Sequence, residues 1–290
     1  MTLRDYLKNQ YSETAIQSYE STIKRYCLIM GEKKETATYS DILNYIGLLR
    51  ETGVHPKTLR NNLFAIKIYY RYLVSIGKRN DHPCQYLNLK DQINRQIQVD
   101  SLYPKEVLEE LFENWQSKNP IHQRRDKIII SLLVFQALLV LEISQIKTSD
   151  IDLVNATIRI QGNNKNKGRT LALKPNQIML FHLYLKEDYK LFQKKQKPSK
   201  RLDYLILNDE GLQMWQGGIN RIINKERDKQ NKLTPLKIRQ SVIAYLLKNE
   251  NDLRIVQEFA GHRRTSSTEA YKQTGLEELK VAVEKLHPLQ

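Results

Sequence analysis

The chain of 290 residues is long enough for two domains of ordinary size. Its 47 lysines and arginines outnumber 32 aspartates and glutamates, and the net charge of +15 favours a polyanionic partner, most often nucleic acid. The two cysteines, Cys27 and Cys84, lack metal-ligand spacing and argue against a disulfide framework, which fits a reducing compartment. A basic protein without a polyanionic partner remains the alternative.

The sequence shows no sign of a leader or a membrane span. Its first residues lack the apolar segment of a signal peptide. The longest apolar run, residues 128–141, is interrupted by Ser131 and Gln136 and is too short to cross a bilayer. We therefore expect a cytoplasmic protein in which this run forms a buried helix.

Residues 1–89 read as a compact bundle of about four helices. Each predicted segment has apolar residues three and four positions apart, and the first three end at a glycine. These segments cover residues 12–31, 40–53, 54–77 and a short turn from 81. The polar, weakly periodic residues 90–102 are predicted to be a linker between this domain and a second one.

Four basic residues of the third helix lie outside its apolar stripe: Lys57, Arg60, Lys67 and Arg71. The last three are seven and four residues apart, so they lie near one face, which suits a phosphate backbone. An ordinary solvated face is the alternative. The nearby Tyr69, Tyr70 and Tyr72 are expected in the core or an interface.

Residues 103–290 are predicted to form a mainly helical domain with a small antiparallel sheet. The strand-like stretches are 157–160 and 170–173, joined by a turn at 162–168, with a possible third strand at 204–207. The predicted helices cover residues 103–115, 127–139, 142–147, 175–193, 216–230 and 235–249.

The stretch from Arg254 to Tyr271 closes this domain. It begins as a short amphipathic helix that stops at Gly261, continues through His262 and two arginines, and ends in a short helix carrying Tyr271. A tyrosine, a histidine and clustered arginines in so basic a chain suggest phosphate chemistry on nucleic acid.

The order of these segments resembles the tyrosine recombinase (phage integrase) family, including its Xer-type members. The likeness covers almost the whole chain, and it is most specific from Asp252 to His262, with Thr268, Tyr271 and the ending Leu286-His287-Pro288. It implies a two-domain clamp on double-stranded DNA, made of a helical, SAM-like core-binding domain and a mixed α/β catalytic-type domain.

The resemblance also implies a mechanism for DNA integration and recombination. A tyrosine hydroxyl attacks a phosphodiester, which gives a 3′-phosphotyrosyl bond and a free 5′-hydroxyl. No metal or other cofactor is needed, because the phosphotyrosine keeps the bond energy. Two arginines clamp the negative oxygens of the transition state, histidines supply further hydrogen bonds, and a hairpin lysine protonates the leaving oxygen.

Only part of the family's site is carried over. Tyr271 matches the nucleophile, His262 the histidine nine residues before it, and Arg239 the second arginine. The hairpin lysine is Lys165 or Lys167, and the turn length leaves this choice open. The alternatives are a core tyrosine, a surface salt bridge for the arginine and a solvated turn lysine. Arg263 and Arg264 are expected to contact DNA.

Two positions depart from the family's pattern. Leu139 stands where the first arginine is expected, and Leu236 where a histidine or lysine is expected. Gln240 also replaces a histidine. Arg125 lies upstream by about 21 Å along a helix, too far to substitute, and Lys147 lies beyond a turn. The tyrosine is therefore expected to be correctly placed but poorly supported.

Three functions remain open. The first is a site-specific recombinase with impaired activity. The second is an inactive, architectural DNA-binding subunit that works with an active recombinase. The third is a helical protein-interaction module; a type IB topoisomerase is a mechanistic cousin that fits the motif less well. Apolar residues after Tyr271 predict a tail helix that docks on a neighbouring subunit or packs in cis: Leu276, Leu279, Val281, Val283 and Leu286.

Overall fold

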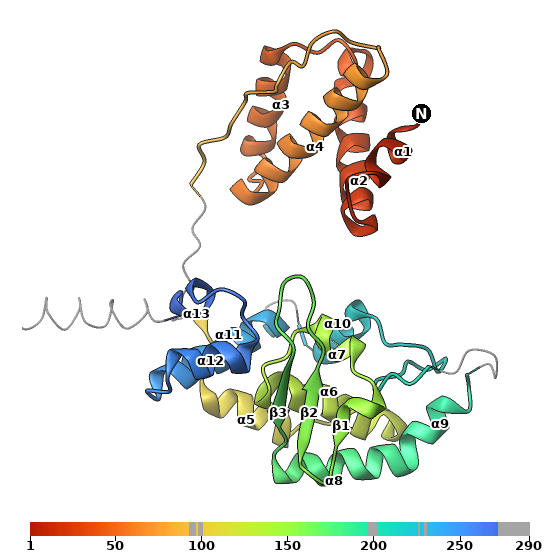
Figure 1. Ribbon diagram of the computed structural model, residues 1–290, viewed down its shortest axis with the longest axis vertical. Helices are drawn as coiled ribbons and strands as arrows, with labels where there is room; N and C mark the ends of the chain where they lie inside the picture. The colour runs from red at the N-terminus through yellow and green to blue at the C-terminus, as the bar shows by residue number, and fades with distance from the viewer. Residues whose placement is uncertain (93–96, 98–100, 197–201, 226, 229–230, 272–290) are drawn as a thin grey trace, which may run out of the picture. The chain divides into compact units, whose positions relative to one another are not determined.

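A computed structural model describes residues 1–92, 97, 101–196, 202–225, 227–228 and 231–271 (Figure 1). The chain forms two compact units, Met1–Arg95 and Gln96–Gln290, and each is described by itself. The predicted tail helix after Tyr271 lies outside the described residues, as does part of the predicted linker.

The first unit is helical throughout its regular structure. Its elements are α1 (Leu3–Lys8), α2 (Glu13–Met30), a 3₁₀ turn (Gly31–Lys34), α3 (Tyr39–Glu51) and α4 (Pro56–Ser75). The short α1 was not predicted, although Thr2 and Asp5 form a capping box at its start. A second capping box, between Thr38 and Asp41, starts α3 at Tyr39, one residue before the predicted segment 40–53 begins.

Tyrosines fill the centre of this first unit. Tyr26 and Tyr70 are fully buried, and their hydroxyl groups lie 2.6 Å apart. Tyr69 is also buried and packs edge-on against Tyr70. Tyr69 and Tyr70, which were predicted to lie in the core or an interface, therefore lie in the core, whereas Tyr72 is half-buried and Phe64, on the same helix, is 39% exposed.

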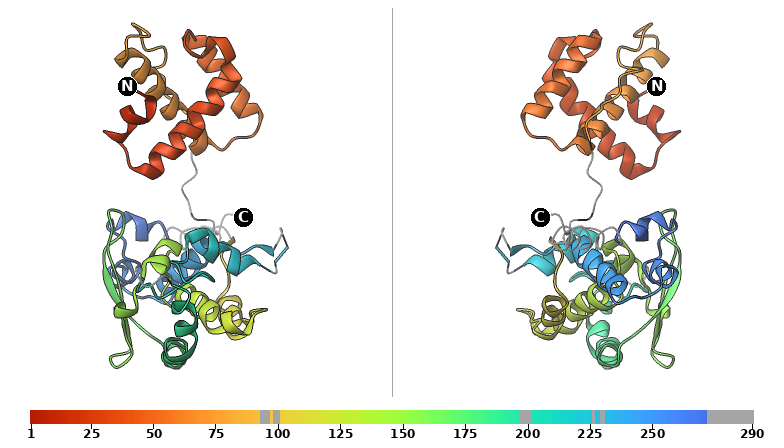
Figure 2. Two further views of the ribbon diagram at one scale, coloured as in Figure 1. Left: turned by 90° about the vertical axis from the view of Figure 1, so that its right-hand side faces the viewer. Right: turned by 90° about the vertical axis from the view of Figure 1, so that its left-hand side faces the viewer.

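The second unit combines helices with one three-stranded antiparallel sheet of order β1-β2-β3. In β2 and β3, Ile158 pairs with Leu171, and the buried residues alternate along both strands. The sheet lies at one edge of the unit, with helices on its inner side (Figures 1 and 2). The elements of the second unit are α5 (Lys105–Glu113), α6 (Gln123–Phe135), α7 (Val140–Gln145), β1 (Ile151–Asp152), β2 (Thr157–Ile160), β3 (Arg169–Ala172), α8 (Pro175–Leu183), α9 (Tyr189–Gln193), α10 (Gln216–Asn224), α11 (Pro235–Lys248), α12 (Leu253–Ala260) and α13 (Ser266–Glu269).

Helix α6 forms the centre of the second core. Ile128, Ile129, Ile130, Leu132 and Leu133 are all fully buried, because the helix is covered on several sides. The prediction of a buried helix in this run is confirmed. No helix among the described residues is long and apolar enough to cross a membrane.

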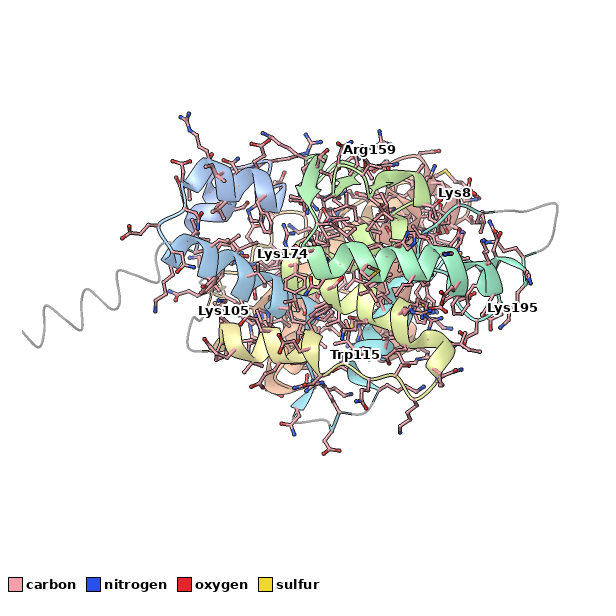
Figure 3. The ribbon with its side chains drawn as sticks, turned by 90° about the horizontal axis from the view of Figure 1, so that it is seen from below. Lys8, Lys105, Trp115, Arg159, Lys174 and Lys195 are labelled. Atoms are coloured by element: carbon pink, nitrogen blue, oxygen red, sulfur yellow. The ribbon has the colours of Figure 1, made fainter. Side chains whose placement is uncertain are left out.

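Several boundaries differ from the sequence-based predictions. Helix α6 ends at Phe135 rather than 139, because Ala137 adopts a positive φ of 49° that ends the helix. The third strand is β1, whereas 204–207 makes only isolated bridges, through Tyr204 and Leu207. The predicted helix from 175 to 193 holds one π-helical segment, Tyr184–Asp188. Lys174 and Lys195 are labelled at the two ends of this helical stretch (Figure 3).

Candidate active site

The closing stretch forms a tight turn at Gly261. Asp252 caps α12 by accepting a hydrogen bond of 2.7 Å from the Arg254 amide, and Gly261 ends the helix in the left-handed region at φ 68°. A Cβ atom at position 261 would lie 2.5 Å from Nη1 of Arg169. Glycine is therefore required both by the backbone conformation and by the guanidinium that lies against it.

The turn directs the His262 ring toward α13. Its Nδ1 lies 2.9 Å from the hydroxyl oxygen of Thr268, which is fully buried. The His262 carbonyl accepts a hydrogen bond of 3.1 Å from the Gln257 side chain. The pKa of His262 is lowered to about 4, mainly by burial and further by the positive charges of Arg239 and Arg169. The imidazole is therefore neutral at neutral pH.

Tyr271 lies against this histidine. The two rings are nearly parallel, at 16°, with centroids 6.4 Å apart. The tyrosine is 7% exposed and packs with Ile243, Val256 and Ala260. Burial raises the pKa of Tyr271, and the charge of Arg239 opposes that rise. The phenol is therefore protonated at neutral pH and needs a proton acceptor before it can act as a nucleophile.

Arg239 projects from α11 into the same region. It is 3% exposed, and its guanidinium donates hydrogen bonds to the carbonyls of Ala137 and Ala260. Its Nη1 lies 4.0 Å from a carboxylate oxygen of Glu142. Burial lowers the pKa of Arg239, yet a guanidinium remains charged in proteins. A buried positive charge therefore lies within the closing turn.

Glu142 and Arg169 complete this site, although neither was predicted from the sequence to have a role in it. The Arg169 guanidinium donates to both Glu142 oxygens, at 2.7 and 3.1 Å, and both side chains are 2% exposed. A sequence signal for Arg169 existed: it shares the buried face of β3 with Leu171, and an arginine on a buried strand face requires an anionic partner.

The two leucines occupy the surroundings of Arg239 in different ways. Leu139 caps α7 through its amide, which donates a hydrogen bond of 2.8 Å to Glu142, and it is half-buried. It follows Ala137, which accepts from Arg239, by two residues. Leu236 lies in the first turn of α11 and is 55% exposed.

Arg125 contributes nothing to this region. It is buried and pairs with Asp126 at 2.9 Å and with Asp209 at 3.1 Å. It also donates to the Leu207 carbonyl at 3.2 Å. Its guanidinium is thus committed to a different set of partners.

The β2–β3 hairpin is attached to the closing turn. The Lys167 amide donates a hydrogen bond of 2.9 Å to the Gly261 carbonyl, and Asn166 forms a bridge with His262. Asn163 organises the tip by accepting hydrogen bonds from the amides of Lys165 and Asn166, at 2.8 and 2.9 Å. Lys165 therefore lies at the tip and Lys167 beside Gly261, and both are exposed.

The other predicted contact residues are distributed over both units. Arg263 is exposed, and its guanidinium donates a hydrogen bond of 2.8 Å to the Asn163 carbonyl; Arg264 is exposed beside it. In the first unit, Arg60 donates a hydrogen bond of 2.6 Å to the Asp91 carbonyl. Of the other basic residues predicted on α4, Lys57 and Arg71 are exposed and Lys67 is half-buried.

The structure thus brings Tyr271, His262 and Arg239 together, with Glu142 and Arg169 beside them. These groups offer a neutral imidazole, a protonated phenol and one more buried guanidinium than carboxylate. Such a set suits a negatively charged oxyanion and a hydroxyl nucleophile. Among the described residues, no group of three or more His, Cys, Asp or Glu side chains could hold a metal ion.

Two family models match the chain. Residues 101–277 match the phage integrase family, and residues 3–77 match the phage integrase N-terminal SAM-like domain. Over 285 residues, the chain is 26% identical to tyrosine recombinase XerD of Listeria monocytogenes, covering 96% of this chain and 93% of the relative. Over 289 residues, it is 27% identical to tyrosine recombinase XerC of Bacillus licheniformis, covering 97% and 93%.

Solved structures share the fold. The XerH recombinase bound to its difH substrate before cleavage matches with a TM-score of 0.67 at 20% identity, covering 89% of this chain and 77% of that one. The Tn1549 transposon integrase in complex with transposon right end DNA matches with a TM-score of 0.65 at 16% identity, covering 99% of both chains. At these identities the likeness establishes the fold.

Proposed function

Because the chain belongs to the phage integrase family of tyrosine recombinases, we propose that it binds double-stranded DNA and cleaves it weakly through Tyr271. Family membership places the chain in site-specific DNA recombination. The observation that carries the finer proposal is the cluster around Arg239, in which a tyrosine, a histidine and a buried cation from different elements lie close together.

Each group has a chemical role in this proposal. The Tyr271 oxygen forms a bond to the phosphorus, and the bond from phosphorus to the 5′ oxygen breaks, leaving a 3′-phosphotyrosyl link. Arg239 stabilises the negative charge on the non-bridging oxygens, and His262, whose imidazole is neutral, accepts the proton that the Tyr271 hydroxyl loses. Lys165 or Lys167 protonates the departing 5′ oxygen. No metal or other cofactor takes part.

Two substitutions support weak rather than efficient cleavage. Leu139 offers no donor near the carbonyl that Arg239 contacts, and Leu236 offers none from the first turn of α11. Loss of one preorganised donor to an oxyanion costs on the order of 10²–10³ in rate. Two such losses leave a nucleophile with an incomplete set of stabilising groups.

The proposed DNA contacts lie on both units. Lys57, Arg60, Lys67 and Arg71 would meet the phosphate backbone from α4, and Arg263 and Arg264 from the closing turn. The net charge of +15 supports this arrangement, as do the DNA-bound structures that share the fold. Affinity for DNA should therefore fall steeply as salt concentration rises.

The sequence after Tyr271 supports self-association or association with a partner recombinase on DNA. Its apolar residues recur at spacings that allow one apolar helical side: Leu276, Leu279, Val281, Val283 and Leu286. In this proposal they dock on a neighbouring subunit. The competing function is an inactive architectural subunit, which is favoured by Leu139 and Leu236 and needs only the basic surfaces.

A suicide substrate tests the proposal. The protein is incubated with duplexes, carrying candidate target sites, in which a nick beside the cleavage position lets the cut fragment diffuse away. A covalent protein–DNA band that disappears in Tyr271→Phe is the expected result. Salt-sensitive binding to the same duplex without any band would instead establish the architectural function. Binding that does not change with salt would overturn the DNA proposal itself.

A further inference from the structure

Three charged side chains lie together near His262. Arg169 and Glu142 form a doubly hydrogen-bonded pair, and Arg239 lies 4.0 Å from the same carboxylate. All three side chains are 2–4% exposed. Two guanidiniums and one carboxylate give the cluster a net charge of +1, so how that charge is distributed decides what the site can bind.

The carboxylate is not shared equally. Both Glu142 oxygens accept hydrogen bonds from Arg169, at 2.7 and 3.1 Å, and one oxygen also accepts from the Leu139 amide at 2.8 Å. Arg239 instead donates to two neutral carbonyls, those of Ala137 and Ala260. Its positive charge is therefore held in place by groups that do not neutralise it.

We infer that Arg169 is a positioning residue that holds the Glu142 carboxylate away from Arg239, and so keeps the charge of Arg239 available to a phosphate. This inference rests on the proposed function. The charge of Arg239 matters in this chain because position 139 is a leucine. Arg239 would then stabilise the phosphate without the first arginine that the family uses.

The physical reason is the cost of an unpaired buried charge. If Arg169 were neutral, the buried Glu142 carboxylate would lose both guanidinium hydrogen bonds and would need another cation. Arg239 is 4.0 Å away, so a movement of about 1 Å would give a direct pair at ordinary hydrogen-bond length. That pair would cancel the charge that the phosphate requires.

A second observation fixes Arg169 in this position. Its Nη1 lies 2.5 Å from the position that a Cβ of residue 261 would take, so Gly261 leaves room for the guanidinium. Its Nε is buried without a hydrogen-bond partner among the described residues. Such a geometry sacrifices one donor and keeps the two that bind Glu142, which indicates that the pairing with the carboxylate determines where the arginine lies.

The ring of His262 can report this charge distribution without any DNA cleavage. Arg239 and Arg169 lower its pKa, and Glu142 raises it. The test follows the ring signal of His262 by NMR against pH in protein labelled at histidine Cε1, with the signal assigned through His262→Gln. It compares the unchanged chain with Arg169→Met, Glu142→Gln and the double variant.

The inference predicts an order of pKa values. Arg169→Met should raise the pKa of His262 by about 1, because the local charge falls from +1 to zero. The double variant restores +1 and should return the pKa to about 4. Glu142→Gln alone should lower it further. Arg125→Met, which breaks a buried pair with other partners, should leave it unchanged.

Cleavage should follow the same order. Arg169→Met should lose about tenfold or more in covalent-complex formation, and the added Glu142→Gln should restore most of it. If the double variant titrates like Arg169→Met, or is folded and no more active, Arg169 acts through packing and the inference fails. If no variant cleaves DNA, the proposed function fails, while the titration still decides whether Arg169 acts through its charge or through packing.

Discussion

The Nδ1 atom of His262 and the hydroxyl oxygen of Thr268 lie 2.9 Å apart, and this pair connects the closing turn to α13. Thr268 is fully buried, so the packing around it holds the hydroxyl that contacts the imidazole in place. The histidine thus has a defined orientation, which a proton-transfer or hydrogen-bonding role at a phosphate requires.

Acid should destabilise the second unit through this histidine. The folded pKa of His262, about 4, lies below that of an unfolded histidine, near 6.5. Between these two pH values the unfolded chain therefore binds more protons than the folded chain. The contribution of His262 to the free energy of unfolding is fully present above pH 6.5 and is lost as the pH falls toward 4. In thermal unfolding between pH 7 and 4, His262→Gln should reduce this fall, whereas the exposed-site variant His182→Gln should not. Equal pH profiles for the two variants would contradict the assigned environment.

Gly261→Ala should destabilise the chain by more than its backbone conformation alone explains. Gly53 provides a matched control, because its φ of 73° resembles the 68° of Gly261 while nothing lies within 4 Å of its Cβ position. We expect a cost of about 1 kcal/mol for Gly53→Ala and about 2–4 kcal/mol for Gly261→Ala, measured by urea unfolding. Similar costs at the two sites would show that the Arg169 contact relaxes freely.

Alanine variants of Arg263 and Arg264 should distinguish a role in anchoring the hairpin from a role in binding DNA through positive charge. Each alanine variant loses one exposed positive charge, so both should weaken DNA binding by a similar factor. Only Arg263 donates to the Asn163 carbonyl. Arg263→Ala should therefore speed hydrogen exchange at the Lys165 and Asn166 amides, and Arg264→Ala should not. A hairpin equally protected in both variants would rule out the anchoring role.

Under the proposed function, adding donors at positions 139 and 236 should raise covalent-complex formation. Leu236 is 55% exposed, so Leu236→His removes little buried apolar surface, and Leu139→Arg adds a cation close to the segment that Arg239 contacts. The double variant should cleave at least tenfold faster than the unchanged chain on the suicide substrate. Leu236→Gln provides a control for polarity without an imidazole. The absence of any gain would count against the assignment of positions 139 and 236.

The two hairpin lysines can be distinguished by the leaving group. A 5′-bridging phosphorothioate needs no protonation on departure, because a thiol is far more acidic than an alcohol. Whichever of Lys165→Ala and Lys167→Ala loses cleavage of ordinary DNA and regains it on the sulfur substrate identifies the general acid. If neither variant shows this rescue, the proton comes from another group.

The sequence predicted the fold class through its apolar periodicity, and it grouped Tyr271, His262 and Arg239 through its resemblance to the tyrosine recombinase family. It did not give Glu142 or Arg169 their place in the site, since their pairing joins residues 27 positions apart and depends on how β3 meets the start of α7. It misplaced the third strand, because the apolar residues 204–207 satisfy strand propensity while forming only bridges.

The two carbonyls that hold Arg239 lie far from it along the chain. Ala137 precedes it by 102 residues, and Ala260 follows it by 21. Such non-local contacts require long loops to close, which slows folding. During synthesis, Ala260 is added 21 residues after Arg239, so one of the two acceptors is made later than the side chain that it holds. The buried cation can therefore reach its final position only after nearly the entire chain has been made.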